Sequence, residues 1–500
     1  MENRQYGHSA PGTSLVAEPP PGRPLRWARI VLVSALVTGA AAGAMLVLLP
    51  SERPAEQPPA LPRGAGAGVR PPVPAAGPPA QVLTAVVSGV PAALPDLVSL
   101  IGREESAVRA RPRDARAWAV LGTAYVRQGR LTADAANYPK AERALRTSLE
   151  VRGTGNAEAL GGMTALANAR RDFPAAKRYG EQALKLTPKQ WTVYPPLIDA
   201  YTGLGDYTAA RSTLDKLMGL RTGAAARPAV MARASAVYRD RGWREDAVAQ
   251  LTDAAAAAGT PAEQAAYLTA LGELAWERGD LEDALRHFEG AVRLDPGRRE
   301  ALAGKGRTLA ALGRTAQALT AYQAALAGQP DPRNTLELGE LYESMGLTRD
   351  AQAQYDLLQT RMRQAAAGGV DEELVAGRFE ADHGDPGEAV TRLEEEYQRQ
   401  PGIEVADALG WALHRAGDDQ EALTYAVTAT DKAKGGGVRS ALYAFHRGVI
   451  EHELGQDAPA RRHLQEALRV NPYFSPLYAP AARAALRDLG EVPEEPLPPA

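Results

Sequence analysis

The chain has 500 residues, 45% of them hydrophobic, a formal net charge of -3 and no cysteine. This length can hold several domains or one extended array, and the nearly balanced charge provides no global field of the kind that attracts nucleic acid. The lack of cysteine excludes disulfides, thiol catalysis and cysteine zinc sites, but it leaves the redox compartment open.

The first predicted element along the chain is a transmembrane helix at residues 30–49, which read IVLVSALVTGAAAGAMLVLL. The stretch carries no charge, and at about 1.5 Å per residue it covers the roughly 30 Å hydrocarbon core of a bilayer. Arg23, Arg26 and Arg29 stand before it, and the far side is poorer in positive charge. The positive-inside rule therefore predicts a single-pass protein of the cell membrane, with residues 1–29 as a disordered cytoplasmic N-terminus and the rest extracytoplasmic.

A cleaved signal peptide, cut near residues 40–44, is the alternative for this segment. The apolar run continues past that point to Leu49, which favours a retained anchor. Residues 50–81 follow, rich in proline and alanine and poor in large side chains. Such a composition cannot bury enough surface to fold and favours extended, polyproline-like conformations. We therefore expect a semi-rigid linker that holds the rest of the chain away from the membrane.

From about residue 93 onward, one pattern recurs about every 33 to 34 residues. Its clearest copy is YLTALGELAWERGDLEDALRHFEGAVRLDP, in which the recurring positions are Gly272, Gly279, Ala284 and Phe288. The next copy carries Gly306, Gly313, Ala318 and Tyr322 at the same places. Apolar residues spaced three and four apart predict two helices in each copy, each with one buried stripe. The glycine that ends the first helix suits a left-handed turn.

This pattern resembles the tetratricopeptide repeat family, in its membrane-anchored bacterial form, over roughly residues 93–490 and in about ten units. The resemblance implies an all-α fold in which helix-turn-helix units stack into a right-handed α-solenoid with a concave inner surface. We place the repeat array at residues 82–474. The repeats follow the transmembrane helix and the proline-rich linker.

Two local features modify this array. Pro195 and Pro196 interrupt a predicted first helix, so we expect a kink or a late helix start there and a change in superhelical pitch. Residues 475–490 predict one more amphipathic helix, which covers the last unit. Residues 491–500, EVPEEPLPPA, predict a disordered tail.

The stretch HELGQD contains part of a zinc-protease signature, which needs a second histidine four residues after His452. That place is taken by Gln456, beyond the expected helix end, and Gly455 fills the turn position of a repeat. The other histidines are scattered, and no nucleophile and base can be paired in such an array. We therefore predict no catalytic residue, no metal site, no cofactor and no enzyme activity.

In the repeat family, the inner surface is lined by the first helix of each unit. By that resemblance, the candidate partner-binding residues are Trp276, Trp411, Glu273, Arg307, Glu340, Arg378, His414 and Phe445. The two tryptophans are the leading candidates for peptide anchors, because they lie beside the packing positions rather than in them. Ordinary packing between neighbouring first helices is the alternative. The Asn/Lys clamp of chaperone-binding members is missing, since its places hold Ala119, Thr123 and Gly161.

The leading hypothesis is a membrane-anchored scaffold whose extracytoplasmic repeats bind a protein or peptide in the concave groove. It predicts no nucleic-acid partner and no small-molecule substrate. One alternative is a factor that holds apocytochrome during cytochrome c maturation, because the stretch from Leu100 to Arg130 resembles the repeats of such proteins. Another alternative is an envelope or polysaccharide assembly factor or a regulatory subunit.

Overall fold

The structure is a computed structural model, and it describes residues 83, 85–86, 90–431 and 437–490. These residues belong to one compact unit, Val73–Ala500. Their secondary structure consists of α-helices α2 to α23 and short 3-10 turns, and this part of the chain contains no strand. The prediction of an all-α solenoid is therefore confirmed.

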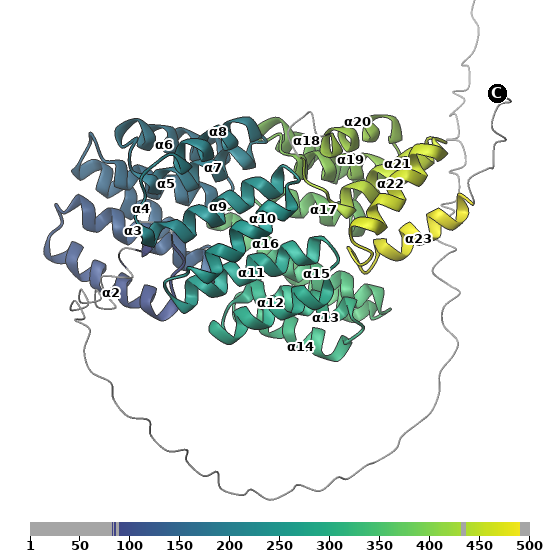
Figure 1. Cartoon of the computed structure of the whole chain (residues 1–500), viewed down its shortest axis with the longest axis horizontal. Coiled ribbons are helices and arrows are strands. Elements are labelled where there is room, and N and C mark those ends of the chain that lie inside the picture. The colour runs from purple at the N-terminus through teal and green to yellow at the C-terminus, as the bar shows by residue number, and fades with distance from the viewer. Residues whose placement is uncertain (1–82, 84, 87–89, 432–436, 491–500) are drawn as a thin grey trace, which may run out of the picture. The chain divides into compact units, whose positions relative to one another are not determined.

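Among the described residues, helices α3 to α22 form ten hairpins, and Figure 1 shows them following one another along the unit. The first helices of the hairpins are α3 (Ala115–Thr132), α5 (Ala157–Ala169), α7 (Tyr194–Gly203), α9 (Arg227–Asp240), α11 (Pro261–Glu277), α13 (Arg299–Ala311), α15 (Pro332–Ser344), α17 (Glu373–His383), α19 (Ile403–Ala416) and α21 (Ala441–Glu453). The second helices are α4 (Asn137–Val151), α6 (Phe173–Leu186), α8 (Tyr207–Met218), α10 (Arg244–Ala256), α12 (Leu281–Leu294), α14 (Thr315–Ala325), α16 (Thr348–Ala367), α18 (Pro386–Arg399), α20 (Asp419–Thr430) and α22 (Asp457–Val470). Helix α2 (Leu94–Ala110) precedes the hairpins and α23 (Tyr478–Asp488) follows them.

The turns inside the hairpins confirm the expected role of glycine in most units. Left-handed backbone occurs at Gly205, Gly242, Gly279, Gly313, Gly346, Gly417 and Gly455, with φ between 71° and 93°. Three units lack a left-handed glycine. The α5–α6 hairpin turns at Arg171, with φ 60°. Gly129 lies inside α3, which continues to Thr132 and ends at Ala133 with φ 51°. Gly384 has φ -135° and is not left-handed.

Glycines within the first helices let aromatic side chains of the second helices come close. Phe288 on α12 is fully buried. A Cβ on Gly272 would lie 2.6 Å from its ring, and one on Gly304 would lie 2.3 Å from it. Tyr355 on α16 approaches Gly339 equally closely, at 2.3 Å. Because a core of native density has no room for an added methyl group, these glycines are packing positions.

The expected late helix start at the proline pair is present. Residues Trp191–Val193 form the 3-10 turn η2, and α7 begins at Tyr194 with proline in its first turn. Proline is tolerated there because the first backbone N–H groups of a helix have no partner within the helix. Helix α7 is therefore short, with ten residues.

Later units lie against earlier ones along a line of contacts that we call the inter-turn seam. Four consecutive hairpin turns, from α5–α6 to α11–α12, meet four consecutive junctions between units, from α16–α17 to α22–α23. The α5–α6 turn forms two hydrogen bonds, Arg170 Nε to the Gly368 oxygen at 3.0 Å and the Phe173 nitrogen to Gln400 Oε1 at 3.2 Å. The α7–α8 turn meets its junction where Gly205 approaches Pro401. The last two turns form hydrogen bonds from Arg244 Nη2 to the Arg439 oxygen at 2.6 Å and from Asn471 Nδ2 to the Trp276 oxygen at 2.7 Å. This regular spacing is what successive turns of a superhelix produce.

Backbone meets backbone along the inter-turn seam. A Cβ on Gly205 would lie 2.6 Å from the Pro401 oxygen, and a Cβ on Gly242 would lie 2.3 Å from the Gly437 oxygen. Figure 1 shows the corresponding arrangement, with α8 next to α18. Gly205 and Gly242 therefore allow the close backbone contact at the seam as well as the left-handed turn.

The predicted transmembrane helix, residues 30–49, lies outside the described residues, as do residues 1–29, the linker and residues 491–500. Among the helices that the structure describes, none has the length and apolar character needed to cross a membrane.

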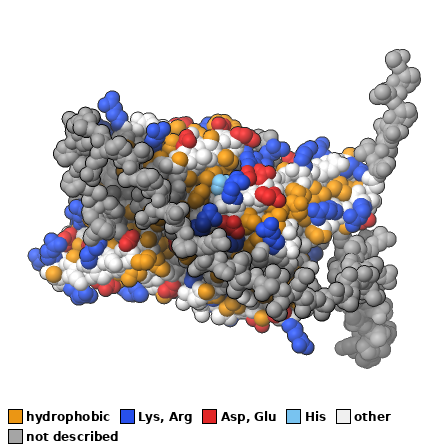
Figure 2. All heavy atoms as spheres, turned by 60° about the horizontal axis from the view of Figure 1, so that its bottom comes forward, with side chains coloured by type: hydrophobic (Ala, Val, Ile, Leu, Met, Phe, Trp, Pro, Cys, Tyr) orange, Lys and Arg blue, Asp and Glu red, His pale blue; other side chains and the backbone are white. Residues whose placement is uncertain are grey.

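Charges of both signs are interspersed on the face of the molecule drawn in Figure 2. Helix-surface ion pairs include Arg286 with Asp283 at 2.8 Å and Arg392 with Glu388 at 2.9 Å. This mixture agrees with the small net charge. The unusual charge arrangements lie instead on the side of the first helices that lines the cavities.

Candidate functional site: three cavities along the inner face

Three cavities lie along the side of the first helices that we call the inner face. The N-terminal cavity, about 450 Å³, lies among α3, α5, α7 and α9. The middle cavity, about 390 Å³, includes Arg239 and Glu404 in its wall. The C-terminal cavity, about 540 Å³, extends from α11 to α23. Arg233 lines both the first and the second, and Arg333 lines both the second and the third, so the cavities form a series.

The structure brings five of the eight predicted partner-binding residues together in the C-terminal cavity. They are Trp276, Arg307, Glu340, Arg378 and Trp411.

The other three predicted residues lie elsewhere. Glu273 forms an ion pair with Arg307 beside the C-terminal cavity, at 2.6 Å. His414 Nδ1 lies 2.5 Å from Asp419 Oδ1, at a helix end. Phe445 is 2% exposed and belongs to the core. That any of the eight binds a partner stays a prediction.

Arg307 in the C-terminal cavity is paired with two carboxylates through its Nη atoms, while its Nε has no hydrogen-bond partner among the described residues. Its Nη2 donates to Glu273 at 2.6 and 2.8 Å, and its Nη1 donates to Glu337 at 3.1 Å. The guanidinium also lies 5.0 Å from the centre of the Trp276 ring, a cation–π distance. Burial acts to lower the pKa of Arg307, but Glu273 and Glu337 outweigh it and hold the pKa above its ordinary value.

Trp411 is held by side chains of the chain itself. Its Nε1 donates to Asp382 at 3.0 Å, and its ring stacks on His446 with 4.2 Å between centroids. Tyr478, from the last helix α23, meets the ring edge-on and donates its hydroxyl to Asp382. The indole is only 7% exposed. These contacts are ordinary packing, the alternative that the sequence left open, although one edge of Trp411 still faces the cavity.

The middle cavity concentrates arginines around one carboxylate. Burial acts to raise the pKa of Glu404, but Arg333, Arg378, Arg239 and Arg171 outweigh it and keep the pKa below its ordinary value. The four guanidiniums come from first helices and from a hairpin turn that are far apart in the chain. Asp199, Asp240, Asp371 and Glu396 line the middle cavity as well, so its arginines face several carboxylates.

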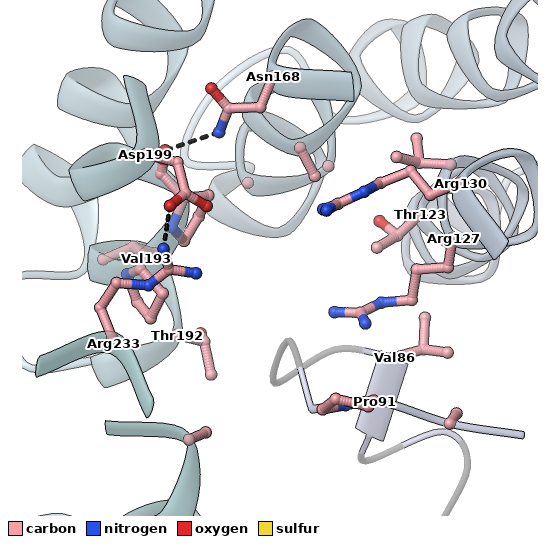
Figure 3. Close-up of a pocket in the computed structure, with 18 of the residues that line it drawn as sticks. Val86, Pro91, Thr123, Arg127, Arg130, Asn168, Thr192, Val193, Asp199 and Arg233 are labelled. Carbon is pink, nitrogen blue, oxygen red and sulfur yellow. Dashed lines mark hydrogen bonds and ion pairs between the residues drawn. The ribbon is translucent and has the colours of Figure 1, made fainter. Parts of the chain in front are cut away.

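The N-terminal cavity contains two arginines that sequence reasoning missed. Arg127 and Arg130 extend from α3 into the space between that helix and the facing wall, where Asp199 is paired with Arg233 (Figure 3). Arg127 Nη1 donates to the Val90 oxygen at 3.2 Å. Burial and the charge of Arg130 lower the pKa of Arg127 to about 10.

The sequence signal for these arginines was the stretch VRQGR. VRQG was interpreted as the end of the first helix with Gly129 as its turn, and neither arginine was considered for the inner surface. Helix α3 instead runs to Thr132, which places the two side chains one helical turn apart on its inner side. The wall opposite also contains Asn168, whose Nδ2 donates to the Pro196 oxygen at 2.7 Å.

The histidine that suggested a metal site lies near the end of α21, and Gly455 forms the turn after it with φ 71°. His452 Nδ1 is 3.4 Å from Asp457 Oδ1. Within the described part of the chain, no three histidine, aspartate or glutamate side chains converge as metal ligands do. The stretch is therefore a hairpin turn like the others.

A family model described as "Tetratricopeptide repeat" matches residues 104–147, 231–299 and 269–335. No curated protein sequence is significantly similar to the chain. Among solved structures, the human IFIT1 dimer with m7Gppp-AAAA is 18% identical, over 64% of this chain and 72% of that one, with a TM-score of 0.44. A tetratricopeptide repeat protein from Parabacteroides merdae is 17% identical, over 53% of this chain and 99% of that one, with a TM-score of 0.31. Yeast Tom70 is 14% identical, over 73% and 96%, with a TM-score of 0.30.

Proposed function

We propose that the chain, in which residues 104–147 and 231–335 match the tetratricopeptide repeat model, is a non-enzymatic scaffold that binds a segment of a partner protein along its inner face. The observation that carries this proposal is the series of three cavities lined by first helices. Each has the volume of a site for a few side chains. Cavities joined in series suit an extended polypeptide better than a compact small molecule.

The walls of the cavities offer the two kinds of contact that peptide recognition needs. Apolar surface is supplied by residues such as Trp191, Pro195 and Trp276, and charged groups by Arg127 and Arg378. Buried aromatic and arginine side chains are the common anchors of binding interfaces.

Placing a bulky side chain in the N-terminal cavity tests this proposal. The full-length chain in detergent micelles would be used to select binders from a displayed library of random decapeptides. Gly161 lines the N-terminal cavity, and a Cβ there would meet no atom within 4 Å. We expect Gly161→Phe to fold normally and to weaken the selected peptides at least tenfold, measured by fluorescence anisotropy.

Gly102→Phe is the matched control. Gly102 also lies in a helix, in α2, and an added Cβ would meet no atom there, but it lines none of the three cavities. Peptide affinity should be unchanged in this variant. The proposal fails if no peptide is selected. It also fails if Gly161→Phe and the Trp276→Ala, Trp411→Ala double variant both bind as tightly as the unaltered chain.

For the location, we propose that residues 30–49 anchor the protein in the cell membrane and that the repeats are extracytoplasmic. The support is the uncharged stretch and the arginines that precede it. A reporter enzyme that is active only outside the cytoplasm, fused after Ala500, should be active in cells. Activity of a cytoplasm-specific reporter at the same place would contradict the orientation.

A further inference from the structure

The N-terminal cavity contains a pair of positive charges that no carboxylate of the described residues neutralises. Arg127 and Arg130 are three residues apart on α3 and both line the cavity (Figure 3). Glu158, Asp199 and Glu300 line it as well, and none of them forms an ion pair with either arginine.

Two of those carboxylates already have partners. Asp199 is paired with Arg233, and Glu158 lies 3.7 Å from Arg116. Arg127 Nε is buried and has no hydrogen-bond partner among the described residues. The only hydrogen bond of its guanidinium in that part of the chain goes to a neutral backbone oxygen, that of Val90. Arg127 is half-buried, and a partly buried guanidinium without an anion is costly, so an anionic ligand at this place would be stabilised.

The other residues that line the N-terminal cavity indicate which kind of group would bind next to an anion there. Val86, Pro91, Trp191 and Pro195 provide apolar surface in the same cavity, and the volume of about 450 Å³ exceeds what one carboxylate needs. A carboxylate flanked by an apolar side chain fits both parts of the wall. The planar guanidinium forks of two arginines one helical turn apart match the geometry of a carboxylate.

We propose that Arg127 and Arg130 form the subsite that holds an aspartate or glutamate side chain of a partner polypeptide, with an apolar neighbour of that residue against Trp191. This inference rests on the proposed function, because it names the chemistry of the segment that the inner face binds. According to this proposal, the N-terminal cavity is the part of the array that recognises a negatively charged side chain of the partner.

The test uses decapeptides selected on the full-length chain in micelles. We expect glutamate or aspartate next to an apolar residue to be enriched among them. In a synthetic peptide of that kind, glutamate to glutamine should weaken binding at least tenfold. The same change should have no effect on an Arg127→Gln, Arg130→Gln variant, and the double-mutant cycle then measures the coupling directly. Arg127→Lys with Arg130→Lys should recover part of the affinity.

Arg143→Gln with Arg146→Gln is the matched control, because these two arginines have the same spacing on α4 but line none of the three cavities. It should leave the affinity unchanged. Peptides selected without acid enrichment, or acidic peptides that bind the Arg127/Arg130 variant as tightly as the unaltered chain, would overturn the subsite while leaving the proposed function in place. If no peptide is selected, both fail. If acidic peptides bind only after residues 491–500 are deleted, the acidic tail of the chain itself occupies the subsite. The proposal that a partner occupies it would then be wrong.

Discussion

The N-terminal and C-terminal cavities are built by the same repeat, yet their arginines are in opposite situations. Arg307 in the C-terminal cavity meets two carboxylates and an indole ring. Arg127 in the N-terminal cavity meets a backbone oxygen and another arginine. Tyr478 from the last helix also lines the C-terminal cavity and packs against Trp411. The repeat therefore fixes where side chains point, and the residues chosen decide whether a cavity is completed by the chain or left for a ligand.

The largest expected difference between the two cavities concerns their tryptophans. Trp411→Ala should lower the free energy of unfolding by about 3 kcal/mol, because a large buried ring is removed from an aromatic cluster. Trp191→Ala should cost about 1 kcal/mol, since this ring is half-buried and faces the N-terminal cavity. Urea denaturation followed by circular dichroism measures both. Equal losses would mean that Trp191 is as structural as Trp411.

The arginines provide the second test. Arg307→Gln leaves Glu273 and Glu337 without their cation, and we expect a loss of about 2 kcal/mol, less than for a fully buried pair. Arg127→Gln removes a charge that has no carboxylate partner, so stability should stay within about 0.5 kcal/mol of the original or rise. Parallel denaturation curves decide this. A loss for Arg127→Gln as large as that for Arg307→Gln would contradict the difference between the cavities.

We expect the pH dependence of stability to come from His383 in α17, which lies in the C-terminal half of the array. His383 Nδ1 lies 3.3 Å from Glu343, and its Nε2 lies 4.0 Å from Glu340. Burial acts to lower the pKa of His383, but these carboxylates outweigh it and raise the pKa to about 9.

The pKa of His383 is higher in the folded state than its ordinary value of 6.5. The protonated His383 therefore stabilises the folded state fully below about pH 6.5, and this contribution is lost as the pH rises through about 9. We expect a loss of about 2 kcal/mol, reduced from the full shift because Glu343 is half-exposed. Unfolding free energies at pH 6.5 and 10 measure it. The loss should be absent in His383→Gln, and its persistence there would assign it to another group.

A smaller effect tests the inter-turn seam, which brings the later units against the earlier ones. Gly242→Ala should cost about 1 kcal/mol more than Gly313→Ala. Both glycines have left-handed backbone, with φ 76° and 73°, but only Gly242 meets a backbone oxygen from the other side of the seam. Thermal denaturation of the two variants isolates that contact. Equal losses would show that the seam adds nothing to stability.

Much of this fold could be predicted from periodicity. The glycines and aromatic residues that recur every unit, such as Gly272 with Phe288, report contacts between neighbouring helices, and those contacts are the same in each copy. Pro195 and Pro196 also predicted the late start of α7. Local chemistry determines such features, so it is visible in a single sequence.

The seam and the unpaired arginines could not be predicted in that way. Gly242 at the seam and Gly313 away from it occupy the same place in the repeat, so nothing in the pattern separates them. Arg130 was missed because α3 continues past Gly129, where most other units turn, and Arg127 was not considered for the inner surface. Trp411 was expected to face a partner, and only the three-dimensional structure shows Tyr478 and His446 on its ring.

The most direct test of the difference between the two cavities is fluorine NMR of the full-length chain with 5-fluorotryptophan at its six tryptophans. Each resonance would be assigned by single substitution, and an acidic decapeptide selected on the chain would be titrated in. We expect the Trp191 resonance to shift with the peptide while those of Trp276 and Trp411 change little. Shifts confined to Trp276 and Trp411 would contradict this account and place recognition in the C-terminal cavity.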